Sequence, residues 1–105
     1  MRFVRSIRED LARRDFTVGA MAWHPERGLF DPFGGQNDLK NRILRAVGDP
    51  DTRFTEDALR ILRGVRFASE LGFAIEGNTA AAMRRQLGRL SCVAAERVRE
   101  ELTRL

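Results

Sequence analysis

The sequence predicts a mainly α-helical fold that carries one short β-hairpin. Two apolar runs flank a Pro-Glu-Arg-Gly turn at Pro25 to Gly28, a pattern typical of a hairpin. The second half instead spaces its apolar residues three and four apart, as amphipathic helices do. With 105 residues and 43% hydrophobic side chains, the chain is long enough for one domain with a modest core. We therefore distinguish a mixed segment, residues 1–48, from a helical segment, residues 49–105.

Local signals predict the first helix and the hairpin. Ser6 and Glu9 have the spacing of a capping box, which predicts a helix from Ile7 to Arg14 with another turn after it. In the hairpin that follows, Trp23 and Phe30 lie on opposite strands, and we expect them to pack near each other.

The stretch DPFGGQNDL predicts a turn followed by a short helix. Gly34 and Gly35 are turn residues that allow positive φ, and residues 45–47 predict a further strand. The glycines lack the spacing of a dinucleotide fingerprint or a P-loop. Asp31 and Asp38 are expected to cap helices rather than to bind a metal ion.

One long helix is predicted across the middle of the chain. Asp49 and Pro50 have the order of an N-cap followed by a first-turn proline. The apolar stripe after them continues to Leu71, where Gly72 provides a stop.

Two more helices are predicted after it, the first capped by Asn78 and the second by Ser91. The last one is still in helical rhythm at Leu105, and Met1 leads directly into the first helix. We therefore expect the chain to be a piece of a longer protein that is truncated at its C-terminal end.

Cysteine and histidine are too few for several classes of site. Cys92 is the single cysteine, which excludes an intramolecular disulfide and indicates a reducing cytoplasm. His24 is the single histidine, so there is no zinc-ligand spacing, and we predict no metal site. Cys92 is expected in the core and His24 in a solvated turn. No apolar run approaches the length of a membrane span, so no membrane partner is expected.

The basic residues are almost all arginine. Lys40 is the one lysine among nineteen basic residues, which stand against fifteen acidic ones and give a net charge of +4. Arginine suits planar, bidentate recognition of phosphates and base edges, which favours a nucleotide or nucleic-acid partner. A GC-rich coding sequence is an equally good explanation of the bias.

The stretch EDALRILRGVR places Asp57, Arg60, Arg63 and Arg66 at steps of three. Asp57 offers only acceptors and Arg60 only donors, so side by side they can pair with a nucleobase edge, leaving the later arginines for phosphates. The alternative is a solvated helix face, because Glu56 and Arg60 form a favourable i,i+4 pair. In ARRDFT, two arginines at a helix end can clamp a triphosphate or simply complement the helix dipole.

Three stretches in this order are more specific than any one of them: EDLARRDFTVGAMAW, then GLFDPFGGQNDLKNRILRAVGDPDTRFTEDALRILRGVRFASELGF, then AAERVREEL. Together they resemble the class II tRNA nucleotidyltransferases, the bacterial-type CCA-adding enzymes, whose relatives include CC-adding and A-adding enzymes and bacterial poly(A) polymerases. The resemblance covers nearly the whole chain. It implies that residues 1–48 are the C-terminal portion of a nucleotidyltransferase head domain and that residues 49–105 are the helical neck that selects the nucleotide.

The resemblance also implies a role for each arginine-rich motif. Asp57 and Arg60 would read the base of the incoming CTP or ATP without a nucleic-acid template. Arg63, Arg66 and the second arginine of the RRD motif, Arg14, would hold the nucleotide. The parent enzyme would add these nucleotides to the tRNA 3′ end. The ERVREEL segment would buttress the helix that reads the nucleotide.

Two departures from the family pattern limit this implication. Gly19 stands where the family usually has asparagine, which removes a polar side chain beside the phosphate clamp. The paired aspartates that hold two magnesium ions (Mg2+) in the family have no match in this chain. We therefore expect no catalytic residue here and an inactive chain when it is isolated.

Two other functions stay open at this stage. The first is the poly(A) polymerase branch of the same family. The stretch DPFGG is evidence against this branch. The second is a stand-alone nucleotide- or RNA-binding module with a degenerate pocket, for which Gly19 is a hint. The isolated chain is also expected to self-associate through apolar faces that other domains would cover.

Overall fold

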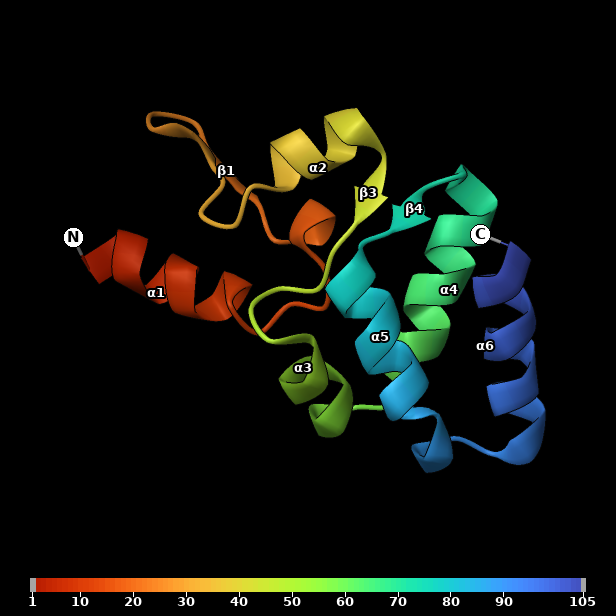
Figure 1. The fold of residues 1–105 in the computed structure, drawn as a ribbon. Coiled ribbons are helices and arrows are strands. Elements are labelled where there is room, and N and C mark those ends of the chain that lie inside the picture. The colour runs from red at the N-terminus through yellow and green to blue at the C-terminus, as the bar shows by residue number, and fades with distance from the viewer. Residues whose placement is uncertain (1, 105) are drawn as a thin grey trace.

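The computed structural model describes residues 2–104, with the side chains of residues 5–103, and is mainly helical with a short hairpin, as predicted (Figure 1). The α-helices are α1 Arg2–Leu11, α2 Gly35–Asn41, α3 Pro50–Glu56, α4 Leu59–Leu71, α5 Gly77–Arg85 and α6 Cys92–Arg104. The strands are β1 Ala22–His24, β2 Gly28–Phe30, β3 Ile43–Leu44 and β4 Ala74–Ile75, and the 3-10 turns are η1 Thr17–Gly19 and η2 Leu87–Arg89. None of the described helices is long and apolar enough to cross a membrane.

The hairpin forms where it was predicted, but its two aromatic residues do not meet. Antiparallel pairing sets Trp23 opposite Leu29 and Ala22 opposite Phe30. Neighbouring residues of a strand face opposite sides, so Trp23 and Phe30 point apart. Trp23 is 72% exposed, whereas Phe30 packs on a small core of Leu11, Ala20 and Val47. The expected contact between the two aromatics is therefore wrong.

Helix α1 begins and ends earlier than predicted, at Arg2 and Leu11 instead of Ile7 and Arg14. Ser6 is exposed inside this helix, so it cannot act as its N-cap. Ile7 and Leu11, four residues apart on one helix face, pack toward the small core. Tertiary packing of this face, rather than a capping box, decides where the helix lies.

The long central helix is interrupted at Asp57. Helix α3 ends at Glu56, Asp57 is extended with φ −156° and ψ 104°, and α4 begins at Leu59. The Asp57 carboxylate accepts a hydrogen bond from the Leu59 amide at 2.9 Å, so it starts a new helix instead of continuing the old one. Helix α3 packs against α5, and α4 packs against α6. One straight helix could not make both contacts.

A parallel pair of very short strands joins the two halves of the chain. Strand β3 pairs with β4, Ile43 opposite Ala74 and Leu44 opposite Ile75. The strand predicted at residues 45–47 is thus found two residues earlier, and Ala46 forms only an isolated antiparallel bridge with Phe16. The strand forms where its distant partner β4 lies, which no local signal reports.

The main core contains residues from both halves. Phe16, Leu44 and Ala46 pack in one cluster with Phe54 and Ile61 and with side chains of α5 and α6. The division at residue 48 stays a prediction, because this core runs across it. In Figure 1, α4, α5 and α6 lie together while α1 projects to the other side, in a molecule that measures 47 × 26 × 18 Å.

Most helix ends of the second half agree with the sequence. Pro50 is in the first turn of α3, Gly72 ends α4 with φ 70°, and the Ser91 hydroxyl accepts from the Ala94 amide at the start of α6. The cap of α5 is Glu76 instead of Asn78, because its carboxylate accepts from the Asn78 and Thr79 amides.

Two further predictions concern the C-terminal helix α6 and the residue that follows it. Cys92 is exposed, so its expected place in the core is wrong. Leu105, where the helical rhythm was expected to continue, lies outside the described residues.

The first residue of α2 predicts a large effect of one added methyl group. A Cβ on Gly35 would lie 2.2 Å from the Thr17 carbonyl oxygen, so Gly35→Ala forces backbone atoms apart. We expect it to lower the free energy of unfolding by about 1–3 kcal/mol in urea denaturation. Gly77→Ala, at the first residue of α5 where nothing lies within 4 Å, is the control and should not destabilise. Equal stability of the two variants would contradict this packing.

The cap of α5 predicts a pH dependence. Burial acts to raise the pKa of Glu76, but hydrogen bonds from Asn78 and Thr79 and the charge of Arg45 outweigh it, so the pKa lies below its ordinary value. The ionised cap therefore stabilises the fold fully above the unfolded-state pKa and loses its effect as pH falls through the folded-state pKa. Glu76→Gln should cost about 1 kcal/mol at neutral pH, and this difference should shrink on acidification.

Thermal unfolding of both proteins between neutral and acidic pH measures this effect. The matched control is Glu70→Gln, at an exposed site on α4, which should leave the stability unchanged at every pH. A difference between Glu76→Gln and the parent chain that stays constant down to acidic pH would count against the ionised cap.

Candidate functional site

Helix α4 carries the arginine ladder, and the structure gives its members different surroundings. The side chain of Arg60 is only 16% exposed, whereas that of Arg63 is 51% exposed. Arg66 is exposed on the part of α4 that faces α6. Because residues three apart are rotated relative to one another around a helix, Arg60 and Arg66 face different neighbours.

Asp15, in the loop after α1, joins two members of the ladder. Its Oδ1 lies 2.8 Å from Arg60 Nε, an ion pair without the alignment of a hydrogen bond. Its Oδ2 accepts a hydrogen bond from Arg63 Nε at 2.8 Å. This bond raises the pKa of Arg63 above its ordinary value, although burial acts in the opposite direction. One carboxylate therefore fixes two guanidinium groups.

The remaining donors of Arg60 are also engaged. Its Nη1 donates to Glu56 Oε1 at 2.9 Å, the i,i+4 pair that the sequence offered as the alternative. Its Nη2 donates to the Arg13 carbonyl at 3.2 Å, and Arg53 donates to the neighbouring Ala12 carbonyl. Two arginines thus satisfy carbonyl groups at the C-terminal end of α1. Arg60 has a structural role before any ligand binds.

Asp57 lies beside Arg63 rather than beside Arg60. Its Oδ2 is 3.6 Å from Arg63 Nη2, and its Oδ1 caps the Leu59 amide. Among the described residues no ion pair joins Asp57 to Arg60. The structure therefore places the Asp57 carboxylate beside the Arg63 guanidinium and not beside Arg60, the donor that the sequence predicted, and the base-reading role of Asp57 and Arg60 stays a prediction.

Arg14 and Arg63 border one hollow of about 330 Å³, together with Asp15, Gly19 and Phe67. The side chain of Arg14 is 55% exposed, and its ion pair with Asp10 is long at 3.9 Å. A Cβ on Gly19 would meet no atom within 4 Å, so the hollow has space where the family usually carries asparagine. The structure thus brings two of the predicted phosphate-binding arginines to one place.

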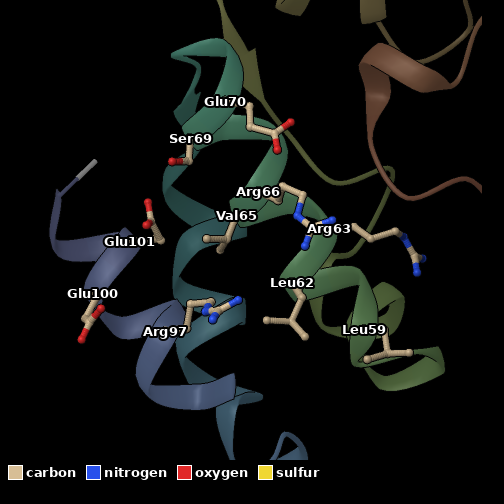
Figure 2. A pocket seen from close by; sticks show the side chains of 10 residues that line it. All are labelled: Leu59, Leu62, Arg63, Val65, Arg66, Ser69, Glu70, Arg97, Glu100 and Glu101. Atoms are coloured by element: carbon tan, nitrogen blue, oxygen red, sulfur yellow. The ribbon is translucent and has the colours of Figure 1, made fainter. Parts of the chain in front are cut away.

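Arg66 belongs to a different hollow. A groove of about 610 Å³ between α4 and α6 is lined by Arg66, Arg63 and Arg97 (Figure 2). Arg63 is the one predicted residue that borders both hollows, and in Figure 2 its side chain points away from the groove.

The described residues do not fit a magnesium site. They contain no group of three or more His, Cys, Asp or Glu side chains that could hold a metal ion. The carboxylates near the ladder, Asp15, Glu56 and Asp57, lie against guanidinium groups.

Two acidic residues have roles that the sequence did not reveal. Asp15 is the aspartate of the RRD motif, and its position directly after two arginines was the one signal in the sequence that could have indicated its role. Asp38 was expected to cap a helix, but it is buried and accepts from Thr17 Oγ1 at 2.6 Å and Arg45 Nε at 3.1 Å. Of the two aspartates that were expected to cap helices, Asp31 does so: its carboxylate accepts hydrogen bonds from the Gly35 and Gln36 amides at the start of α2.

Comparisons with known proteins identify the family of this chain. The family model of the poly A polymerase head domain matches residues 1–45, and a model described as the probable RNA and SrmB-binding site of polymerase A matches residues 72–105. A CCA-adding enzyme of Levilactobacillus brevis is 52% identical over 103 residues, which cover 98% of this chain and 26% of that enzyme.

Solved structures show the same fold. The Bacillus stearothermophilus CCA-adding enzyme in complex with CTP is similar with a TM-score of 0.74 and 43% identity, over 91% of this chain and 25% of the other. The Thermotoga maritima CCA-adding enzyme complexed with tRNA is similar with a TM-score of 0.71 and 34% identity, over 91% and 25% of the two chains.

The chain therefore belongs to the nucleotidyltransferase family that contains the CCA-adding enzymes and the poly(A) polymerases. It spans about a quarter of the length of the curated relatives that it matches.

The shared carboxylate predicts a stability difference between two aspartates. Asp15→Asn removes the charge between Arg60 and Arg63 and should lower the free energy of unfolding by about 1–2 kcal/mol. Asp10→Asn is the control, because its carboxylate is 65% exposed and lies 3.9 Å from Arg14; it should have almost no effect. Urea denaturation measures both, and equal stability of the two variants would show that Asp15 does not hold the ladder.

Proposed function

We propose that this chain is the part of a tRNA nucleotidyltransferase that selects CTP and ATP for template-independent addition to the tRNA 3′ end. The observation that carries the proposal is the juxtaposition of Asp57 with Arg63 at the start of α4, beside the hollow that Arg14 also borders. It puts a base-reading acceptor and donor next to guanidinium groups that suit phosphates.

Base selection follows from the hydrogen-bonding edges of the bases. Cytosine and adenine each carry an exocyclic amino donor next to a ring-nitrogen acceptor, whereas guanine and uracil present a carbonyl group and an N–H there. The Asp57 carboxylate can accept from the amino group, and an arginine of the ladder can donate to the ring nitrogen. Arg60 serves this role if a ligand displaces part of its present contacts; Arg63 is already next to Asp57.

The phosphates are assigned to the hollow. Arg14 makes only a long ion pair with Asp10, at 3.9 Å, and Arg63 is held by Asp15 while its side chain stays half exposed. Two guanidinium groups at one hollow can clamp a chain of phosphates, and Gly19 leaves space for it. We assign Arg66 to the neighbouring groove instead, because that is where its side chain lies.

The relatives support CCA addition in particular, since those named above are CCA-adding enzymes, and the structures named above contain CTP or tRNA. The reaction takes place in the cytoplasm and needs magnesium ions, whose carboxylate ligands the described residues do not supply. The chain by itself is therefore expected to extend no tRNA. Self-association of the isolated chain through the exposed Trp23 and Leu29 is part of the same proposal.

The proposal predicts a selective titration. NMR shift perturbation at low salt should show CTP and ATP binding in preference to GTP and UTP. The sharpest variant is Asp57→Asn, because asparagine keeps the ability to cap the Leu59 amide but loses the charge and replaces one acceptor by a donor. It should abolish the preference while leaving thermal unfolding nearly unchanged.

Arg60→Ala should also abolish the preference, but its contacts with Asp15 and Glu56 make it destabilising as well. The control is Arg85→Ala, whose side chain pairs with Asp51 on α3, away from both hollows, and it should bind all four nucleotides like the parent chain. Equal binding of the four nucleotides by the parent chain would refute the assignment of base selection to this segment.

A further inference from the structure

We propose that Arg89 is a positioning residue for base selection, because it holds the break between α3 and α4 and so sets the place of the Asp57 carboxylate. The inference rests on the proposed function for the role of Asp57 as the base-reading acceptor. Arg89 itself borders neither the hollow of Arg14 nor the groove of Arg66, so it acts through the backbone and not by touching a nucleotide.

The break leaves the Phe54 carbonyl without the partner that a continuous helix would give it. The last backbone hydrogen bond of α3 runs from the Asp57 amide to the Arg53 carbonyl at 3.3 Å. In a continuous helix the next one would run from the Ala58 amide to the Phe54 carbonyl. Among the residues that the structure describes, that bond is not formed. Because Phe54 is buried, an unpaired carbonyl at this place would be unfavourable.

Arg89 supplies the missing donor. Its Nη1 donates to the Phe54 carbonyl oxygen at 2.5 Å, from a residue 35 positions further along the chain. A guanidinium group at the end of α3 also complements the negative end of the helix dipole. The bond therefore offsets the loss that comes from ending α3 at Glu56, and Asp57 can adopt its extended conformation.

The backbone of Arg89 is held by the core on both sides. Arg89 is the last residue of η2, whose first residue, Leu87, is buried in the main core. Leu90 packs against the same core, and its amide donates to the Leu87 carbonyl at 3.0 Å. The guanidinium group thus reaches the end of α3 from a backbone that the core keeps in place.

A second arginine contacts the other end of α3. Arg85, the last residue of α5, donates to both carboxylate oxygens of Asp51 in the first turn of α3, at 3.2 and 2.6 Å. Helix α3 packs against α5 between these two contacts (Figure 1). Arg85 therefore holds the start of α3 and Arg89 holds its end. Only the end continues into the break, so we expect only Arg89 to affect Asp57.

The conformation of Asp57 decides what its carboxylate can reach. At present its Oδ1 accepts from the Leu59 amide at 2.9 Å, and its Oδ2 lies 3.6 Å from Arg63 Nη2. In a helix that ran through Asp57, the Leu59 amide would bond to the Thr55 carbonyl instead, and the carboxylate would leave this position. Loss of the Arg89 bond favours that continuous helix, in which the acceptor is no longer in place for a base.

The first readout is the backbone conformation of Asp57, measured by NMR from its Cα and Cβ chemical shifts in the isotope-labelled chain. The parent chain should give shifts typical of extended backbone, and Arg89→Met should move them toward helical values. Methionine retains a long side chain but donates no hydrogen bond. The matched control is Arg85→Met, which should leave the shifts unchanged. Unchanged shifts in Arg89→Met, or an equal movement in Arg85→Met, would overturn the inference.

The second readout is the titration with the four nucleotides. Arg89→Met should weaken CTP and ATP several-fold, toward the affinity for GTP and UTP, because a smaller fraction of molecules holds the carboxylate in place. Arg85→Met should keep the preference of the parent chain. If the parent prefers CTP and ATP and Arg89→Met keeps the full preference, the inference is wrong and the proposed function stands.

Proline at position 58 should restore the break by another route. Ala58 has φ −64°, which proline adopts, and it follows the extended Asp57, a conformation that suits the residue before a proline. Proline has no amide hydrogen, so it cannot donate to the Phe54 carbonyl and continue α3. Adding Ala58→Pro to Arg89→Met should therefore return both the Asp57 shifts and the nucleotide preference to the parent values.

A double variant that behaves like Arg89→Met would show that Arg89 does not act through the break. Equal binding of the four nucleotides by the parent chain would refute the proposed function. In that case the Asp57 shifts still decide whether Arg89 places the carboxylate: movement in Arg89→Met that Ala58→Pro reverses supports it, and the absence of movement refutes it.

Discussion

The close approach of the loop after α1 to helix α4 is the contact on which the rest of this structure depends. Gly64 makes it possible, because a Cβ there would lie 2.5 Å from Phe16 Cζ. Phe16 can therefore enter the main core beneath α4. Its neighbour Asp15 is then carried to Arg60 and Arg63, and both of its oxygens are used. One missing methyl group thus permits both the core and the ion pairs above it.

This contact gives the arginines of α4 different roles. Arg60 is enclosed between Asp15, Glu56 and the backbone at the end of α1, so it joins the two halves of the molecule. Arg63 is held by Asp15 but still half exposed at the hollow that Arg14 also borders. Arg66 faces α6 and makes no ion pair with any residue that the structure describes. Whether an arginine of the ladder is structural or functional must therefore be answered separately for Arg60, Arg63 and Arg66.

The elements that the sequence predicted correctly have local causes. A proline in the first turn, a glycine that adopts positive φ and a serine that caps an amide each act within a few residues, so the start of α3, the end of α4 and the start of α6 follow from the sequence. One prediction that failed concerns a residue whose place is decided by packing between elements far apart in the chain. Asp57 was expected inside a helix, but packing of α3 on α5 and of α4 on α6 separates the helices there.

The sequence by itself determined the mainly helical class, the position of the hairpin and the composition of the arginine ladder, because these depend on spacing and on backbone preferences of neighbouring residues. Only the tertiary structure decided which arginine is enclosed, which one Asp57 meets and which one is left for the groove. The reason is distance along the chain: Asp15 and Arg63 are 48 residues apart, so no local pattern could report that they meet.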